Sequence, residues 1–273
     1  MQTRVIGVIQ GRMESTRLPG KIMMDIAGKP MLERVFTRAS RSKTIQQTWI
    51  ATTTNPSDGP VADFCAGNHI PVFRGNAYDV LDRFYQLVRD KDIQVIVRIT
   101  ADCPVIDPVL IDEAVNTLIR EKLDFGCNRL PPPFHRTYPI GLDVEVCTMS
   151  ALEESWKRAE KPYQREHVMP YLYEGVEFVR LNPELETGIS SRGYKIGLLH
   201  TSPDYGKYRW TVDTAEDLEF IRKVFEHFKG KDDFSWKDVI DLVHAKPTLM
   251  EINSAIPHKT LQDTDPRSTS SGR

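Results

Sequence analysis

The sequence has few cysteines and no long apolar run. Its four cysteines, Cys65, Cys103, Cys127 and Cys147, form no C-x-x-C pair, and several stand in apolar surroundings. This pattern indicates reduced thiols in or near the core of a cytosolic protein. Because no apolar run approaches about 18 residues, the sequence predicts no membrane span. The N-terminus lacks the basic and apolar regions of a signal peptide, so we expect a cytoplasmic protein.

The sequence also lacks an excess of charge and the common phosphate-binding motifs. It carries 36 basic and 38 acidic side chains, and no stripe mixes basic with aromatic residues, which argues against a nucleic-acid binder. Neither G-x-x-x-x-G-K-[ST] nor G-x-G-x-x-G is present, so side chains must do most of any phosphate binding. His135, His167 and His200 lack metal-ligand spacing, so we expect no zinc site.

Apolar runs alternate with amphipathic segments over the first 121 residues. The Val- and Ile-rich run at 4–10 predicts a strand buried on both faces, typical of a parallel sheet. The other predicted strands are 47–53, 71–75 and 94–100, and the predicted helices are 30–42, 59–70, 77–91 and 107–121. This alternation predicts a doubly wound α/β sheet, in which ligands bind beyond the carboxyl ends of the strands.

The second half is less regular. The proline-rich stretch 129–141 cannot form a regular element. The strands predicted after it are 142–148, 176–181 and 194–200. The predicted helices are 150–161, with Ser150 as its cap, 164–174, broken at Pro170, and 235–245. Over 208–228 a strand is expected to pass into a helix. We expect one domain over 1–250, with the regular alternation at 1–121 and an inserted or appended dimerisation and acceptor region at 122–207. Residues 251–273 are expected to be a polar, poorly ordered tail.

A basic loop, residues 10–21 ("QGRMESTRLPGK"), follows the first predicted strand. Arg12, Arg17 and Lys21 only donate hydrogen bonds, and Gly11 and Gly20 permit close backbone approach. Guanidinium and ammonium groups suit phosphate oxygens, and a polyphosphate commonly binds after the first strand of such a sheet. A solvated surface loop is the alternative.

Two carboxylates follow predicted strands. Asp102 comes directly after the strand at 94–100, and Asp213 stands where the segment 208–228 turns into a helix. An Asx-turn or a helix cap would explain either one alone. If both strands belong to one sheet, the two carboxylates converge opposite the basic loop, as a Mg²⁺ site on a nucleotide phosphate requires.

These residues carry a family resemblance. "GRMESTRLPGK" and "DIAGKPMLERV" resemble the opening of the nucleotide-sugar cytidylyltransferases, which share R-x-x-S-x-R-L-P-G-K. The sequence is similar to the enzymes that activate 3-deoxy-manno-octulosonate and acylneuraminate, and to their relatives in spore-coat polysaccharide synthesis. The stretches that match this last group are "ATTTNPSDGPVADFC", "IPVFRGNAYDVLDRFYQ", "VRITADCPVIDP", "TYPIGLDVEV", "REHVMPYLYE" and "RWTVDTAEDLEFI". Together they cover roughly residues 1 to 225.

The resemblance implies a fold, a reaction and partners. The fold is a Rossmann-like glycosyltransferase-A-type nucleotidyltransferase fold, with a mixed, mostly parallel sheet and helices on both faces. The reaction uses CTP and Mg²⁺ and a small anionic acceptor, releases pyrophosphate, and is often performed by a homodimer. By resemblance, the catalytic residues are Lys21, Arg12 and Asp102, and the metal carboxylates are Asp102 and Asp213. The implied nucleotide-binding residues are Gly11, Arg12, Ser15, Arg17, Lys21, Arg74, Gly75, Asp79, Arg83 and Thr100.

The acceptor side rests on the resemblance too. The candidates to line an acceptor pocket are Arg136, Tyr138, Asp143, Glu145, Arg165, Glu166 and His167. Each of them has an alternative role as a loop or interface residue, and Asp79 and Arg83 have one as an i,i+4 helix pair. The sequence lacks the H-x-S-G-T-D-R stretch of the octulosonate enzymes and carries Met13-Glu14 in its loop, so the acceptor stays open.

Two other classes of function remain. A nucleotide-sugar-dependent glycosyltransferase has the same fold but usually shows a D-x-D metal motif, whereas "TADCP" contains one aspartate. A non-catalytic nucleotide-binding regulator would not need both the loop cations and two metal carboxylates.

Overall fold

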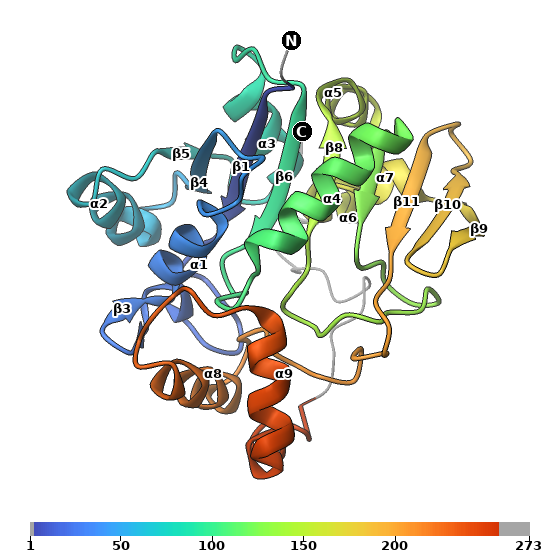
Figure 1. The fold of residues 1–273 in the computed structure, drawn as a ribbon. Helices are drawn as coiled ribbons and strands as arrows, with labels where there is room; N and C mark the ends of the chain where they lie inside the picture. Colours follow the sequence, from blue (N-terminus) through green and yellow to red (C-terminus); the bar gives the residue numbers. More distant parts are fainter. Residues whose placement is uncertain (1–2, 257–273) are drawn as a thin grey trace.

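The computed structural model describes residues 3–256, which are built around a nine-stranded mixed sheet of order β5-β4-β1-β6-β8-β7-β11-β10-β9 (Figure 1). Its strands are β1 (Val5–Gln10), β4 (Gln47–Thr53), β5 (Val72–Gly75), β6 (Val95–Thr100), β7 (Phe125–Cys127), β8 (Glu145–Thr148), β9 (Glu177–Asn182), β10 (Leu185–Ile189) and β11 (Lys195–Leu199). A separate small hairpin joins β2 (Asp25–Ile26) to β3 (Lys29–Pro30).

The strands β5, β4, β1 and β6 run parallel to one another. Helical crossovers link β1 to β4, β4 to β5 and β5 to β6, so all four carboxyl ends meet at one edge of the sheet. Beyond β6 the sheet becomes mixed, because β8 pairs antiparallel with both β6 and β7. The β7–β8 connection therefore returns to the same edge, as Figure 1 shows. The predicted α/β sheet with a parallel core is confirmed.

The helices cover both faces of the sheet. They are α1 (Met31–Ala39), α2 (Gly59–Gly67), α3 (Val80–Val88), α4 (Pro108–Glu121), α5 (Met149–Arg158), α6 (Pro162–His167), α7 (Pro170–Tyr173), α8 (Ala215–His227) and α9 (Trp236–Ala245). Short 3₁₀ turns occur at η1 (Lys21–Met23), η2 (Pro56–Asp58) and η3 (Pro247–Glu251). No helix among residues 3–256 is both long and apolar enough to cross a bilayer.

Alternate side chains of the central strands feed two apolar layers. Val5 and Ile9 of β1 enter one layer, which is completed by α1, α4, α8 and α9. Ile6 and Val8 enter the other, which is completed by α3, α5 and α7. This period-two alternation of large apolar side chains is what a strand buried on both faces requires.

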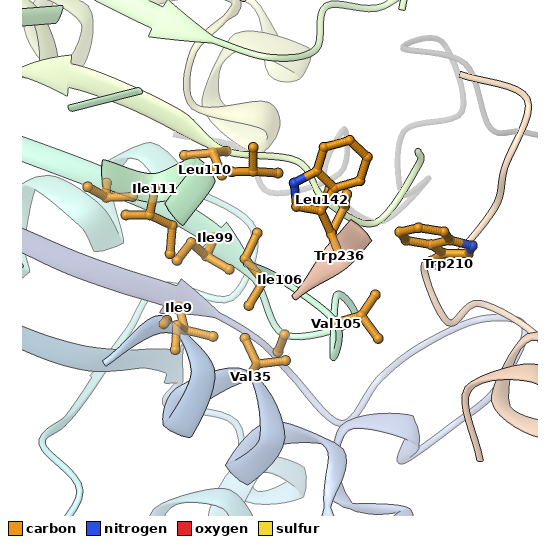
Figure 2. Packing of buried hydrophobic residues seen from close by; sticks show 14 of the residues in the cluster. Ile9, Val35, Ile99, Val105, Ile106, Leu110, Ile111, Leu142, Trp210 and Trp236 are labelled. Atoms are coloured by element: carbon orange, nitrogen blue, oxygen red, sulfur yellow. The ribbon is translucent and has the colours of Figure 1, made fainter. Parts of the chain in front are cut away.

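The first layer extends past the end of the sheet. Figure 2 shows Ile9 and Ile99 from the strands packed near Val35 and Ile106, with Trp210 and Trp236 farther out. Trp210 is fully buried although it lies in an irregular segment. The chain beyond the carboxyl ends of the strands therefore has a core of its own, which fixes the site described below.

Several sequence-based expectations need correction. β7 and β10 were not predicted, and the strand expected at the start of 208–228 is only a single bridge between Ile140 and Arg209. Thr148 caps α5, where Ser150 had been expected. The break expected at Pro170 within 164–174 is present and separates α6 from α7, but α6 begins at Pro162, two residues before the predicted start.

The expected tail at 251–273 is partly ordered. Asn253 is buried, and its side-chain amide donates to Asp217 Oδ1 at 2.9 Å and to the Arg209 carbonyl at 3.1 Å. The start of this segment is thus packed against the domain. The remainder of the expected tail, 257–273, lies outside the described residues.

Candidate active site

Lys21 lies at the centre of the site. Its Nζ donates to Asp102 Oδ2 at 2.7 Å, to the Val212 carbonyl at 2.6 Å and to Asp213 Oδ1 at 3.0 Å. These three acceptors use all three ammonium protons. The side chain is only 9% exposed. The convergence of Asp102 and Asp213 on the basic loop, expected from the sequence, is present in the structure.

The basic loop folds back on itself so that Lys21 faces inward. The Met13 carbonyl accepts from the amides of Ser15 at 2.9 Å and Gly20 at 2.8 Å. Gly20 has φ +73°, a conformation that glycine adopts without steric cost. Buried Asp58 then receives the Met13 amide at 2.6 Å. The Met13-Glu14 position is therefore where main-chain hydrogen bonds hold the loop in its folded shape.

Main-chain hydrogen bonds bring the two aspartates together. The carbonyl of Asp102 accepts from the Val212 amide at 2.9 Å and from Thr211 Oγ1 at 3.3 Å. Asp102 follows β6, and Asp213 immediately precedes Thr214, the N-cap of α8. The segment before α8 is thus laid against the end of β6, which places both carboxylates over the same edge of the sheet.

Three cations surround Asp213. Besides Lys21, Arg17 Nη2 lies 2.7 Å and Arg209 Nη2 lies 2.9 Å from Asp213 Oδ2. Burial alone would raise the pKa of Asp213, but the charges of Lys21 and Arg17 and the hydrogen bonds from Lys21 and Arg209 outweigh it and lower the pKa to about 2. Burial likewise opposes the charge on Lys21, yet Asp102 and Asp213 together raise the pKa of Lys21 above its ordinary value.

Sequence reasoning missed the residues that support Asp213. Arg209 donates from Nε to Asp217 Oδ1 at 2.9 Å and from Nη2 to Asp217 Oδ2 at 3.0 Å. Asp217 is fully buried and also accepts the Asp213 amide at 2.9 Å. The i,i+4,i+8 spacing of Arg209, Asp213 and Asp217 in "RWTVDTAED" is the signal that could have revealed this support.

Arg12 of the basic loop and Arg83 interact electrostatically. Arg12 Nη1 donates to the Ala77 carbonyl at 3.2 Å. Arg83, on α3, is 3% exposed, and its Nε has no hydrogen-bond acceptor among residues 3–256. Burial, together with the charge of Arg12, lowers the pKa of Arg83 to about 10. Such a buried donor fits a bound anion or carbonyl group.

Two other nucleotide candidates, Arg74 and Asp79, are bonded to other parts of the protein. Arg74 donates to the carbonyls of Thr53 and Asn55, both at 2.8 Å, so it holds the loop after β4. Asp79 caps α3 and pairs with Arg165 Nη2 at 2.6 Å. Asp79 thus pairs with a residue of α6, and the i,i+4 surface pair with Arg83 is absent from the described residues.

Small residues make close contacts around the strand ends. A Cβ on Gly11 would lie 2.7 Å from the Ala101 Cβ, and one on Gly75 would lie 3.0 Å from Arg83 Cγ. Thr100 Oγ1 shares a hydrogen bond with Cys103 Sγ at 3.2 Å. The Ser15 amide donates to the Met13 carbonyl within the basic loop, as described above.

The expected acceptor residues do not form one group. Tyr138 is a core residue whose hydroxyl donates to the His200 carbonyl at 3.3 Å, with its ring against Trp236. Glu145 pairs with Arg98. Glu166 and His167 end α6 and are partly exposed.

Arg136 and Asp143 do lie together. Arg136 Nη1 is 3.7 Å from Asp143 Oδ1. We leave Tyr138 out of the proposed site because it is packed in the core.

The donor chemistry of the site fits Mg²⁺. Mg²⁺ on a nucleotide takes one or two protein carboxylates and completes its shell with water and phosphate oxygens. Asp102 and Asp213 supply that number, and no group of three or more His, Cys, Asp and Glu side chains suited to a metal occurs in the described part of the chain. Lys21 Nζ lies between the two carboxylates here.

Fold and site together define an α/β protein with a cationic loop facing a carboxylate pair at the carboxyl edge of its sheet. Residues 6–233 match the family described as Cytidylyltransferase, so the chain belongs to the cytidylyltransferase family. This membership favours the cytidylyltransferase hypothesis over the glycosyltransferase alternative.

Three relatives illustrate the similarity. The chain is 33% identical over 265 residues to the uncharacterized protein MJ1063 of Methanocaldococcus jannaschii, covering 96% of this chain and 99% of that one. It is 29% identical to the spore coat polysaccharide biosynthesis protein SpsF of Bacillus subtilis, covering 89% and 95%. A solved cytidylyltransferase from Leptospira borgpetersenii superposes with a TM-score of 0.78 at 30% identity, covering 94% and 100%.

Proposed function

We propose that this chain transfers CMP from CTP to a small anionic acceptor and releases pyrophosphate. The observation that carries the proposal is the position of Lys21 between Asp102 and Asp213, at the end of the basic loop. Family membership supports CTP as the donor. A sugar acid, a phosphate or a phosphonate is the acceptor class that an arginine-rich site suits.

The basic loop binds the triphosphate in this proposal. Arg12, Arg17 and Lys21 face the β- and γ-phosphates, and Ser15 adds hydrogen bonds. All three Lys21 protons are committed in the present structure, so Lys21 exchanges at least one acceptor for a phosphate oxygen when CTP binds. Arg83, with its unpaired Nε, and Gly75 lie on the nucleoside side.

Asp102 and Asp213 hold Mg²⁺ in this proposal. When bound, the ion supplies charge neutralisation at the phosphates and so assists in-line displacement. Arg209 and Asp217 keep Asp213 ionised and oriented at the mouth of this site.

The chemical step is a displacement at the α-phosphorus. An acceptor oxygen forms a bond to that phosphorus, the bond to the bridging oxygen breaks, and pyrophosphate departs with the electron pair. Lys21, Arg12 and Arg17 stabilise the negative charge that develops on it. A phosphate or phosphonate acceptor needs no general base. A hydroxyl acceptor needs one, and Asp213, whose pKa is about 2, is a weak base, which favours the phosphate or phosphonate class. Positioning and electrostatics provide the rate enhancement.

The two halves of the chain divide these tasks. We assign the nucleotide to residues 1–121 and the acceptor and a homodimer contact to 122–207. The name of the Bacillus subtilis relative supports a role in polysaccharide biosynthesis.

A pyrophosphate-release screen tests the proposal. Each NTP is paired with a 2-keto sugar acid, a sugar phosphate and a small phosphonate, with and without Mg²⁺. We expect release with CTP and one acceptor class only. Asp102→Asn and Lys21→Ala should each reduce the rate at least a hundredfold. Normal turnover by either folded variant would contradict the mechanism.

A further inference from the structure

Two arginines beside Asp143 have donors without acceptors. Arg129 Nη1 lies 3.6 Å from Asp143 Oδ2, and Arg136 Nη1 lies 3.7 Å from Asp143 Oδ1. Both separations are too long for hydrogen bonds. The buried Arg129 Nε and the buried Arg136 Nη1 donate to nothing within residues 3–256. Because an unsatisfied buried N–H group is costly, these donors point to a missing acceptor.

The cluster also carries an uncompensated charge. Arg129 and Arg136 bring two positive charges, and Asp143 brings one negative charge. The adjacent Glu145 pairs with Arg98. Burial opposes the charge on Arg129, but Asp143 and Glu145 outweigh it and raise the pKa of Arg129, so the unbalanced charge lies on Arg136. Burial lowers the pKa of Arg136, and Asp143 offsets this only in part. An anion with at least one negative charge would make the cluster neutral.

The Arg129 side of the cluster is rigidly built. Buried Asn128 donates from Nδ2 to the Leu142 carbonyl at 2.7 Å and accepts the Val144 amide on Oδ1 at 2.9 Å. These bonds join the two ends of the proline-rich loop directly on either side of Asp143. Arg129, the residue after Asn128, is therefore held next to that carboxylate.

The Arg136 side is fixed by its neighbours. The Thr137 carbonyl accepts the Tyr205 amide at 2.7 Å, and Thr137 Oγ1 accepts the Thr201 amide at 2.9 Å. A Cβ on Gly206 would lie 2.2 Å from the Arg136 carbonyl oxygen, so the two loops are in tight contact. Such pre-organisation is typical of a binding site and lowers the entropy cost of holding a ligand.

The cluster adjoins the proposed active site. Buried Cys103 follows Asp102 directly and interacts electrostatically with both Asp102 and Asp143. Arg136 interacts in the same way with Arg209, the residue that supports Asp213. A ligand held by the cluster is therefore next to the carboxylate pair.

We propose that Arg129 and Arg136 form the subsite for the acceptor's oxyanion, which is a carboxylate or a phosphoryl-type group. Asp143 lies between the two guanidinium groups and keeps them apart. This assignment rests on the proposed function, because only that function makes the bound anion the acceptor. It adds Arg129, which the sequence did not suggest, and separates this subsite from the cations of the basic loop.

Probe binding tests the subsite directly. Saturation-transfer NMR follows the methyl protons of acetate and of methylphosphonate with protein whose nucleotide site is filled by a non-hydrolysable α,β-methylene analogue of CTP. Arg129→Gln and Arg136→Gln are compared with wild type and with Arg120→Gln, which replaces an exposed arginine on α4. Calorimetry reports the affinity of each variant for the CTP analogue.

We expect both cluster variants to weaken probe binding at least tenfold, with an unchanged affinity for the CTP analogue and no change in Arg120→Gln. The probe that loses more affinity identifies the oxyanion as carboxylate or phosphonate. If Arg136→Gln does not fold, Arg136→Lys should show an intermediate loss, because lysine keeps the charge with fewer donors.

Probe binding equal to wild type in the folded variants would overturn the subsite. An equal loss of affinity for the CTP analogue would also overturn it, because the cluster would then belong to the nucleotide site. If the variants lose the probes while no acceptor gives pyrophosphate, the proposed function fails and the anion subsite stands. The reverse result removes the subsite and keeps the function.

Discussion

Replacing Lys21 by methionine removes the cation that joins Asp102 to Asp213 while keeping a side chain of similar length. The variant loses three hydrogen bonds, two of them to carboxylates. Removing one partner of a buried ion pair costs about 3–5 kcal/mol. Because the two aspartate side chains remain 26% and 22% exposed, water can solvate them in part. We expect the free energy of unfolding to fall by about 3 kcal/mol, toward the lower end of that range.

The same variant separates the two roles of the carboxylates. In the wild-type protein Lys21 already neutralises Asp102 and Asp213, so Mg²⁺ without nucleotide should stabilise the fold little. In Lys21→Met, Asp102 loses this cation while Asp213 keeps Arg17 and Arg209. The pair can then bind the ion, and a concentration ten times its Kd adds about 1.4 kcal/mol. Urea unfolding with and without Mg²⁺ measures both effects.

Lys43→Met is the control, because Lys43 is exposed and only its amide is bonded, to Asp112 at 3.1 Å. Its unfolding free energy should change by less than about 0.5 kcal/mol. The reasoning is refuted if Lys21→Met without Mg²⁺ is as stable as this control, or if Mg²⁺ stabilises it no more than wild type.

Three further predictions concern the same edge of the sheet. The pKa of Asp213 is lowered from 3.8 to about 2, so its contribution to stability, about 2 kcal/mol, is present above pH 4 and is lost as the pH falls toward 2. Asp213→Asn should therefore reduce the fall of the unfolding free energy at acid pH. A fall as steep as that of wild type would contradict this. Asn253→Ala removes two buried hydrogen bonds and should cost about 1–3 kcal/mol in urea unfolding, whereas a cost equal to that of Ser254→Ala, at an exposed position, would refute the packing of this segment. Gly11→Ala places a Cβ 2.7 Å from that of Ala101 and should lower the free energy of unfolding by about 1–3 kcal/mol; a thermal unfolding midpoint equal to wild type would contradict the contact.

The parallel half of the fold was predictable because its strands and helices each show a clear local pattern in the sequence. Val5 to Gln10 is apolar on both faces, and a run of that kind forms a central strand wherever crossover helices flank it. Because parallel carboxyl ends meet at one edge, Asp102 and Lys21 could be expected near each other from their positions after β6 and β1.

The remainder depends on contacts between distant segments. Asn253 reaches Asp217 only because the chain after α9 returns to the site, and no local pattern encodes that return. Arg165 pairs with Asp79 across 86 residues. Arg83 could be a surface residue of a helix by its sequence, but α3 buries it, and burial lowers its pKa.

The strand β10 escaped prediction for a different reason. β10 has the sequence "LETGI", which mixes polar residues and glycine and lacks the alternation of a half-buried strand. It is a strand because β9 and β11 pair with it on both sides.

Following the α-phosphorus of CTP tests the central claim most directly. CTP labelled with ³²P at the α-position is incubated with Mg²⁺ and each acceptor of the panel, using wild type and Asp102→Asn. The account predicts that wild type transfers the label to one acceptor class and releases an equal amount of unlabelled pyrophosphate, while Asp102→Asn does neither. Label that stays in CTP with every acceptor, or equal transfer by Asp102→Asn, would contradict it.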